Sequence, residues 1–189
     1  MVGTIKVGKL QAADGTSDTI SIESGHKISG ASGSIAVPGS VIQIQKTVTG
    51  SGNSSTTSTS FVATGLSVDI TPKFANSLIK IEFQTVWWLH LSPSAEEYFI
   101  ATVYRTISGG AATNIGTGTG NRVLQWGSKY VDGGNAFNYN EGIQAFTFDT
   151  PSTTTSTNYK LYVHSGGGNE VRYIDQYSEN SITATEIAQ

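Results

Sequence analysis

The chain has 189 residues, which is enough for one domain with a substantial core and a small appendage. Its net charge of −3 and its singly scattered lysines and arginines give no basic surface for nucleic acid or for an anionic membrane. Only 13% of the residues are charged and none is a cysteine, so disulfides and thiolate metal sites are excluded, and glycine, hydroxyl and amide groups must supply most of the surface.

The N-terminal residues do not have the pattern of a targeting segment. Lys6 and Lys9 interrupt any apolar run there, so no signal peptide is predicted. No apolar stretch approaches the roughly 20 residues that a membrane-spanning helix needs. We therefore expect a soluble protein that is made in a cytoplasm and does not insert into a membrane.

Residues 1–40 contain short β-like pieces, TIKV, TISIE and SIAV, separated by turn sequences. Each piece is too short and too sparsely apolar to bury a core by itself. The pattern predicts an extended β arm that gains order by packing on other chains, with a flexible tail as the alternative. Pro38 and Gly39 end this arm.

Residues 41–189 alternate between apolar and polar positions in segments divided by Gly-rich turns. The predicted strands are VIQIQKTV (41–48), GLSVDITP (65–72), LIKIEFQTVWWLHL (78–91), EYFIATVYRTI (97–107), RVLQWG (122–127), IQAFTFDT (143–150), YKLYVHS (159–165), VRYIDQY (171–177) and SITATEIA (181–188). No segment has the 3.6-residue periodicity of a helix of useful length. The sequence therefore predicts an all-β domain, an antiparallel β-sandwich of the jelly-roll type.

The residues that usually carry catalysis are scattered. His26, His90 and His164 have no partner at metal-ligand spacing. Glu96 and Glu97 are adjacent, but neighbours on an extended segment face opposite ways and cannot flank one glycosidic bond. GTGTGN lacks the strand and helix that frame a phosphate loop. A calcium site in DGGNAFNYNEG is the alternative to solvated turn carboxylates. We predict no enzyme activity, cofactor or metal site.

The stretch FQTVWWLHL (83–91) places two tryptophans on one predicted strand. Alternation puts Trp87 on the core face, with Val86 and Trp88 on the opposite face. Further aromatic residues also fall on outward positions, namely Tyr98, Tyr104 and Tyr162. An outward aromatic face on a weakly charged protein indicates a subunit interface formed by Val86, Trp88, Tyr98 and Tyr104. The alternatives are a loop that covers these residues and a platform on which sugar rings stack.

Several longer segments together resemble small structural proteins of tailed bacteriophages, particularly marine ones. The segments are GTIKVGKLQAADGTSDTISIESGHKISG, STSFVATGLSVDITPKFANSLIKIEF, FTFDTPSTTTSTNYKLYVHSGGGNEVRYI and SITATEIAQ. The resemblance covers nearly the whole chain. It implies a jelly roll similar to tumour necrosis factor and complement-type heads, which assemble as threefold trimers with an aromatic-rich inner sheet at the axis. It also implies a component of the virion.

On this resemblance we expect a homotrimeric fibre-type protein. Its arm, residues 1–40, would attach it to another virion protein, and its head, residues 41–189, would contact a glycan or protein of the host surface. The loops expected to make this contact span residues 92–97 and 132–140, with candidate residues Ser94, Glu96, Glu97, Asn135, Phe137 and Tyr139. Three linked heads would allow each contact to be weak.

Two other roles are alternatives for the same chain. A capsid decoration (cement) protein would keep the fold and the trimer and would stabilise the shell at threefold positions. A polysaccharide-degrading tailspike would need a carboxylate pair in a groove and a much longer chain, and neither is seen.

Overall fold

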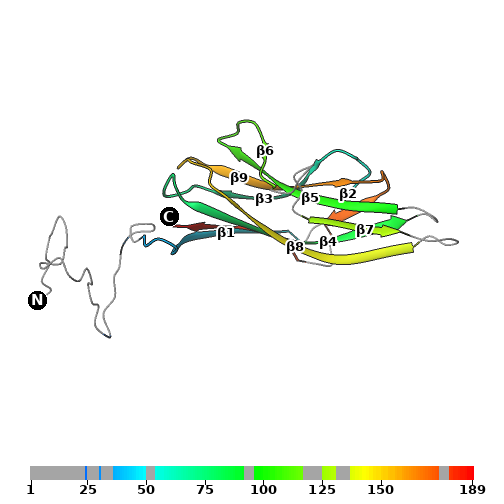
Figure 1. Cartoon of the computed structure of the whole chain (residues 1–189), viewed down its shortest axis with the longest axis horizontal. Coiled ribbons are helices and arrows are strands. Elements are labelled where there is room, and N and C mark those ends of the chain that lie inside the picture. Colours follow the sequence, from blue (N-terminus) through cyan, green and yellow to red (C-terminus); the bar gives the residue numbers. More distant parts are fainter. Residues whose placement is uncertain are drawn as a thin grey trace, which may run out of the picture. The chain divides into compact units, whose positions relative to one another are not determined.

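The computed structural model describes residues 36–49, 54–91, 96–116, 125–130, 137–174 and 179–189, together with Ser24 and Gly30 (Figure 1). At positions 90, 91, 96, 125–130, 137, 138 and 174 the backbone alone is described. The arm predicted over residues 1–40 therefore lies almost entirely outside the described residues. All described strands belong to the unit from Ala36 to Gln189.

The described residues form eleven β-strands and no helix, and the strands pair antiparallel throughout. The strands are β1 (Val41–Thr49), β2 (Ser54–Thr56), β3 (Val62–Ile70), β4 (Leu78–Leu91), β5 (Glu96–Ile107), β6 (Thr113–Asn114), β7 (Gln125–Tyr130), β8 (Phe137–Asp149), β9 (Thr157–Ser165), β10 (Val171–Ile174) and β11 (Asn180–Ile187). The predicted all-β, antiparallel fold is confirmed.

The strands divide between two sheets that lie one over the other in Figure 1. Sheet A has the order β1-β11-β4-β10-β2, and β8 pairs along the other side of β4. Sheet B has the order β3-β9-β5-β6, and β7 also pairs with β5. The long strand β4 organises sheet A, because β8 pairs with it from Ile79 to Leu91 while β11 and β10 share its opposite side. This arrangement is consistent with the predicted β-sandwich.

The core lies between the two sheets and follows from the alternation of side chains along each strand. Ile79, Ile81 and Phe83 of β4 are at most 1% exposed, and Leu66 and Val68 of β3 are nearly as buried. Residues of both sheets join in one apolar cluster. Each large apolar side chain that is fully buried stabilises the fold by about 1.5–3 kcal/mol, so this cluster holds the two sheets together.

A polar contact also links the sheets at the rim of the core. Arg105 of β5 donates from Nη1 to both carboxylate oxygens of Asp149 in β8, at 2.8 and 3.0 Å. The Tyr159 hydroxyl donates to Asp149 Oδ2 at 2.8 Å. Burial, together with the negative charge of Asp149, raises the pKa of Tyr159 well above its usual value, so its hydroxyl remains a donor.

Two strands begin inside the loops that were expected to contact the host. β5 begins at Glu96, so the predicted loop over residues 92–97 ends in strand. β8 begins at Phe137 and takes in part of the predicted loop over residues 132–140. The asparagines of this stretch have low strand propensity, but pairing with β4 as far as Leu91 determines their conformation.

Candidate functional site

The four predicted interface residues lie on two different surfaces. Val86 and Trp88 belong to β4 in sheet A, whereas Tyr98 and Tyr104 belong to β5 in sheet B. All four follow a buried residue and are themselves only partly exposed, and the alternation along each strand points them away from the core. The two pairs therefore lie on opposite outer faces of the sandwich, and the structure does not bring them together in one patch.

The outer face of sheet A, formed by the outward side chains of β1, β11, β4 and β8, is called the A face here. Its most exposed large hydrophobic residues, between 46% and 60% exposed, are Val41, Ile44, Val48, Phe146 and Phe148. Phe146 and Phe148 meet edge to face with ring centroids 5.8 Å apart, and Lys80 Nζ lies 5.2 Å from the Phe146 centroid. Large apolar side chains left this exposed are typical of a surface that meets another chain.

Trp88 has a contact within its own chain on the A face. The guanidinium of Arg172 in β10 lies 4.1 Å from the Trp88 ring centroid, which is the geometry of a cation–π interaction. Arg172 also forms an ion pair with Glu170 at 3.3 Å. Trp88 is therefore partly covered before any partner binds, and its predicted contact with a neighbouring subunit stays a prediction.

A hollow interrupts the A face where β8 carries a glycine. Gly142 pairs with Val86 and leaves an indentation of about 510 Å³. Its lining also includes Gln84, Gln144 and Glu179. A Cβ atom at Gly142 would meet nothing within 4 Å in the described chain, so the hollow would accept a side chain from outside.

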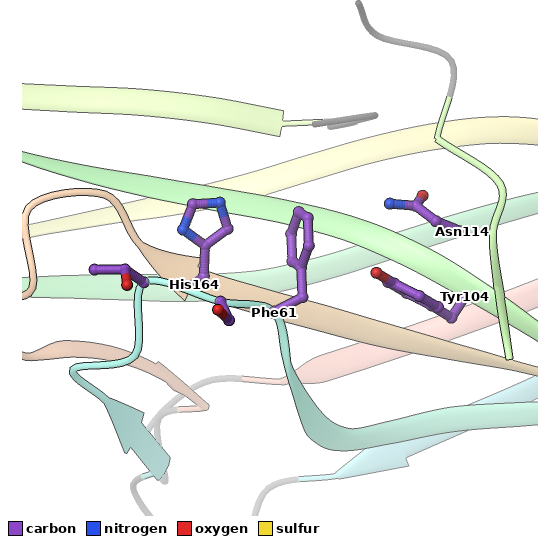
Figure 2. Close-up of a pocket in the computed structure, with 6 residues that line it drawn as sticks. Phe61, Tyr104, Asn114 and His164 are labelled. Carbon is purple, nitrogen blue, oxygen red and sulfur yellow. The ribbon is translucent and has the colours of Figure 1, made fainter. Parts of the chain in front are cut away.

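The outer face of sheet B, called the B face, carries a groove of about 470 Å³. This Phe61 groove is lined by Thr59, Ser60, Phe61, Tyr104, Asn114 and His164. The residues come from β5, β6, β9 and the segment that leads into β3. Figure 2 shows Phe61 and His164 at one end of the groove, with Tyr104 and Asn114 at the other.

The rings of the Phe61 groove contact one another closely. Phe61 meets His164 edge to face with centroids 4.6 Å apart, and Tyr104 in the same way at 6.1 Å. Tyr104 also packs on Tyr162 of β9 at 4.2 Å. The segment before β3 thus covers part of Tyr104. A covering segment was one of the alternatives to a subunit interface for the outward aromatic residues.

Hydrogen bonds fix the polar groups at both ends of this groove. The Asn114 side-chain oxygen accepts from the Thr102 hydroxyl and from the Gly116 amide, both at 2.8 Å. His164 Nδ1 lies 2.9 Å from the Ser165 carbonyl oxygen. The groove is therefore built from side chains whose orientation is set before anything binds.

The predicted host-contact residues are placed differently from one another. Ser94 and Asn135 lie outside the described residues, and Glu96 and Phe137 are described by their backbone, in β5 and β8. Tyr139 is a half-buried β8 residue rather than a loop residue. Its ring lies 5.8 Å from that of Trp87, and its hydroxyl donates to Glu141 Oε2 at 2.9 Å.

The placement of Glu97 in a host-facing loop is wrong, because Glu97 is a fully buried β5 residue. Its Oε1 accepts from the Tyr98 and Gly167 amides at 2.8 and 2.7 Å and from the Ser165 hydroxyl at 3.0 Å. Its Oε2 accepts from the Asn169 amide at 2.7 Å. These bonds fix the turn between β9 and β10, so the carboxylate is not available to a receptor.

Burial and hydrogen bonding act in opposite directions on the Glu97 carboxyl. Burial by itself raises its pKa, but the hydrogen bonds from Gly167, Tyr98, Asn169 and Ser165 favour the ionised form more strongly. The net result is a pKa below the ordinary value of 4.5. Glu97 is therefore a charged group that stabilises a loop.

Among the described residues, no group of three or more His, Cys, Asp or Glu side chains is placed to hold a metal ion. Nor does this part of the chain contain a helix long and apolar enough to cross a membrane. A scan against models of known protein families gave no match, and a search among curated proteins gave none either. The A face and the Phe61 groove are the two described surfaces that combine exposed or grooved aromatic side chains with room for another molecule.

Proposed function

We propose that the chain is a structural protein of a bacteriophage particle. It forms a homotrimeric, fibre-type head, attaches to another virion protein through its N-terminal arm, and contacts the host surface. Support comes from the sequence segments that resemble phage structural proteins and from the strand orders β1-β11-β4-β8 and β3-β9-β5-β7 within the two sheets. Each sheet also holds short strands, β2 and β10 in one and β6 in the other, and the four longer antiparallel strands of each sheet are what a jelly roll requires.

The observation that carries the proposed assembly is the apolar A face. Its exposed valines, isoleucine and phenylalanines lie on β1 and β8, toward the two edges of the sheet. Covering them with other copies of the chain removes apolar area from water, at about 25 cal/mol per Å². Contacts between different parts of the face on successive copies close into a ring when the rotation between copies is that of a threefold axis.

The position of the protein in the particle tests the proposed function. Gold-labelled antibody on purified particles should mark the tail, and deletion of the protein should abolish adsorption to host cells while leaving the capsid stable. Labelling of the shell in many copies, with normal adsorption after deletion, would contradict the fibre-type head. That outcome would favour the capsid decoration protein.

A further inference from the structure

We infer that the Phe61 groove on the B face is a binding site for a neutral saccharide, such as one or two sugar units of a glycan. The site is argued from the groove itself. The inference rests on the proposed function only for the origin of the glycan, which would be the host surface. It also moves the expected host contact from the strand-end loops to the outer face of sheet B.

The aromatic part of the groove suits the face of a sugar ring. A pyranose presents C–H groups on its faces and hydroxyl groups around its rim, so a binding site needs apolar ring surface beside hydrogen-bonding groups. Phe61 and Tyr104 supply two rings inclined at 67°. His164 and Tyr162 pack against these rings at 4.6 and 4.2 Å and hold them in place.

The remaining lining groups suit the rim of a sugar ring. Thr59 and Ser60 are exposed hydroxyl residues at the groove, and Tyr104 contributes a phenol. The Asn114 amide is held in one orientation by its bonds to Thr102 and Gly116. A site whose groups are already ordered loses little side-chain entropy on binding, which matters most for a small polar ligand with few contacts.

Charge and size narrow the class of ligand. None of the six lining residues is Asp, Glu, Lys or Arg, so a phosphate or carboxylate group would find no permanently charged partner among them. On the same sheet, by contrast, an indentation of about 330 Å³ is lined by both Asp69 and Lys160. The Phe61 groove, at about 470 Å³, falls in the range of about 300–1,000 Å³ that small-molecule sites occupy. These features together favour a neutral mono- or disaccharide.

Saturation-transfer NMR on the purified full-length chain tests the inference. The probes are glucose, galactose, N-acetylglucosamine and maltose at millimolar concentration, with glucuronic acid as the charged comparison. At least one neutral sugar should receive saturation, and glucuronic acid should receive little. Phe61→Leu keeps the apolar volume and removes the aromatic face, and it should weaken binding about tenfold, the upper end of what an aromatic contact contributes.

Phe146→Leu is the matched control, because it makes the same change on the A face. It should leave the sugar signal unchanged. Absence of saturation in every neutral sugar would overturn the inference, and so would equal losses in the two variants. A thermal melt of Phe61→Leu identifies unfolding, and in that case Ser60→Ala, which removes one exposed hydroxyl, replaces it. The assay uses neither particles nor host cells, so its failure is distinct from failure of the proposed virion function.

Discussion

The two outer faces of the sandwich hold their aromatic side chains in opposite ways. On the A face, Phe146 and Phe148 are 59% and 46% exposed. On the B face, Phe61, Tyr104 and His164 pack around one another and are half-buried or buried. The B-face rings cover one another, whereas Phe146 and Phe148 touch each other but leave water only if another molecule covers them. Exposure that remains after folding, rather than aromatic content, is therefore the basis on which the A face is proposed as the interface.

The B face also depends on buried groups beneath and beside it. Glu97 fixes the turn that follows β9, and its neighbour Tyr98 lies directly over Gly166 in that turn. The difference between the two faces predicts that association and subunit stability respond to different substitutions. Changes on the A face should alter association and hardly alter the stability of the subunit. Changes at the Glu97 turn should alter stability and leave association intact.

The largest effect is expected from a charge on the A face. Phe146→Glu places a carboxylate where the trimer would bury apolar surface, and burying that charge without a partner opposes association. The mass in solution, measured by light scattering, should fall from that of a trimer to that of a monomer. Ala63→Glu is the control, since Ala63 is an exposed residue of β3 in sheet B. A trimer that persists in Phe146→Glu would contradict the A-face assignment.

A large loss of stability is expected when the Glu97 side chain is removed from the turn between β9 and β10. Glu97→Ala leaves the partly buried Tyr98, Gly167 and Asn169 amides without their acceptor. A hydrogen bond to a charged group contributes about 1.5–3 kcal/mol, and water that reaches the exposed Gly167 offsets part of the loss. We expect the free energy of unfolding to fall by about 3 kcal/mol, measured by urea denaturation at fixed protein concentration. The mass in solution should stay unchanged.

Glu179→Ala is the control for this loss. The Glu179 side chain is 56% exposed and pairs with Lys46 at 2.8 Å. Exposed ion pairs contribute about 1 kcal/mol or less. Equal losses in Glu179→Ala and Glu97→Ala would mean that the hydrogen bonds to the buried carboxylate do not stabilise the turn.

The Glu97 contribution should depend on pH. Because its folded-state pKa lies below the ordinary value of 4.5, the ionised group stabilises the fold fully above that value. The contribution is lost as the pH falls through the lowered folded-state pKa. The stability difference between the wild type and Glu97→Gln should therefore be constant near neutral pH and shrink in acid. A difference that grows as the pH falls from neutral toward 4.5 would mean that the folded-state pKa is raised.

Much of the fold could be predicted from the sequence, because alternation is a local signal. Alternation placed Trp87 in the core and Trp88 on the outer face. In the structure Trp87 is 2% exposed and Trp88 is half-buried. The surface to which an outward residue belongs could not be predicted in this way. β4 and β5 follow one another along the chain but join different sheets, so Trp88 and Tyr104 are separated by the whole sandwich.

Because alternation says nothing about distant contacts, the sequence also could not place Glu97 correctly or reveal the Phe61 groove. Glu97 stands beside a polar Ser- and Pro-containing stretch, and its acceptor role depends on residues 68 to 72 positions away. The groove joins Phe61, Asn114 and His164 from three separate segments. A run of small residues such as SGGGN indicates a turn, but it does not reveal that a distant carboxylate binds the turn's amides.

A pair of glycine-to-alanine changes, one near the B face and one on the A face, should have smaller effects on stability and association. At Gly166 a new Cβ would lie 2.6 Å from Tyr98 Cβ, an atom fixed by the β5 backbone, so Gly166→Ala should lower stability by about 1–3 kcal/mol through overpacking. At Gly142 the Cβ meets nothing within 4 Å of its own chain, so Gly142→Ala should leave the stability of the subunit nearly unchanged. If another copy fills the A-face hollow, Gly142→Ala should weaken the trimer, measured as a higher subunit concentration at half-dissociation. An unchanged dissociation midpoint would place the hollow outside the subunit contact and leave the exposed phenylalanines as the part of the A face that other copies cover.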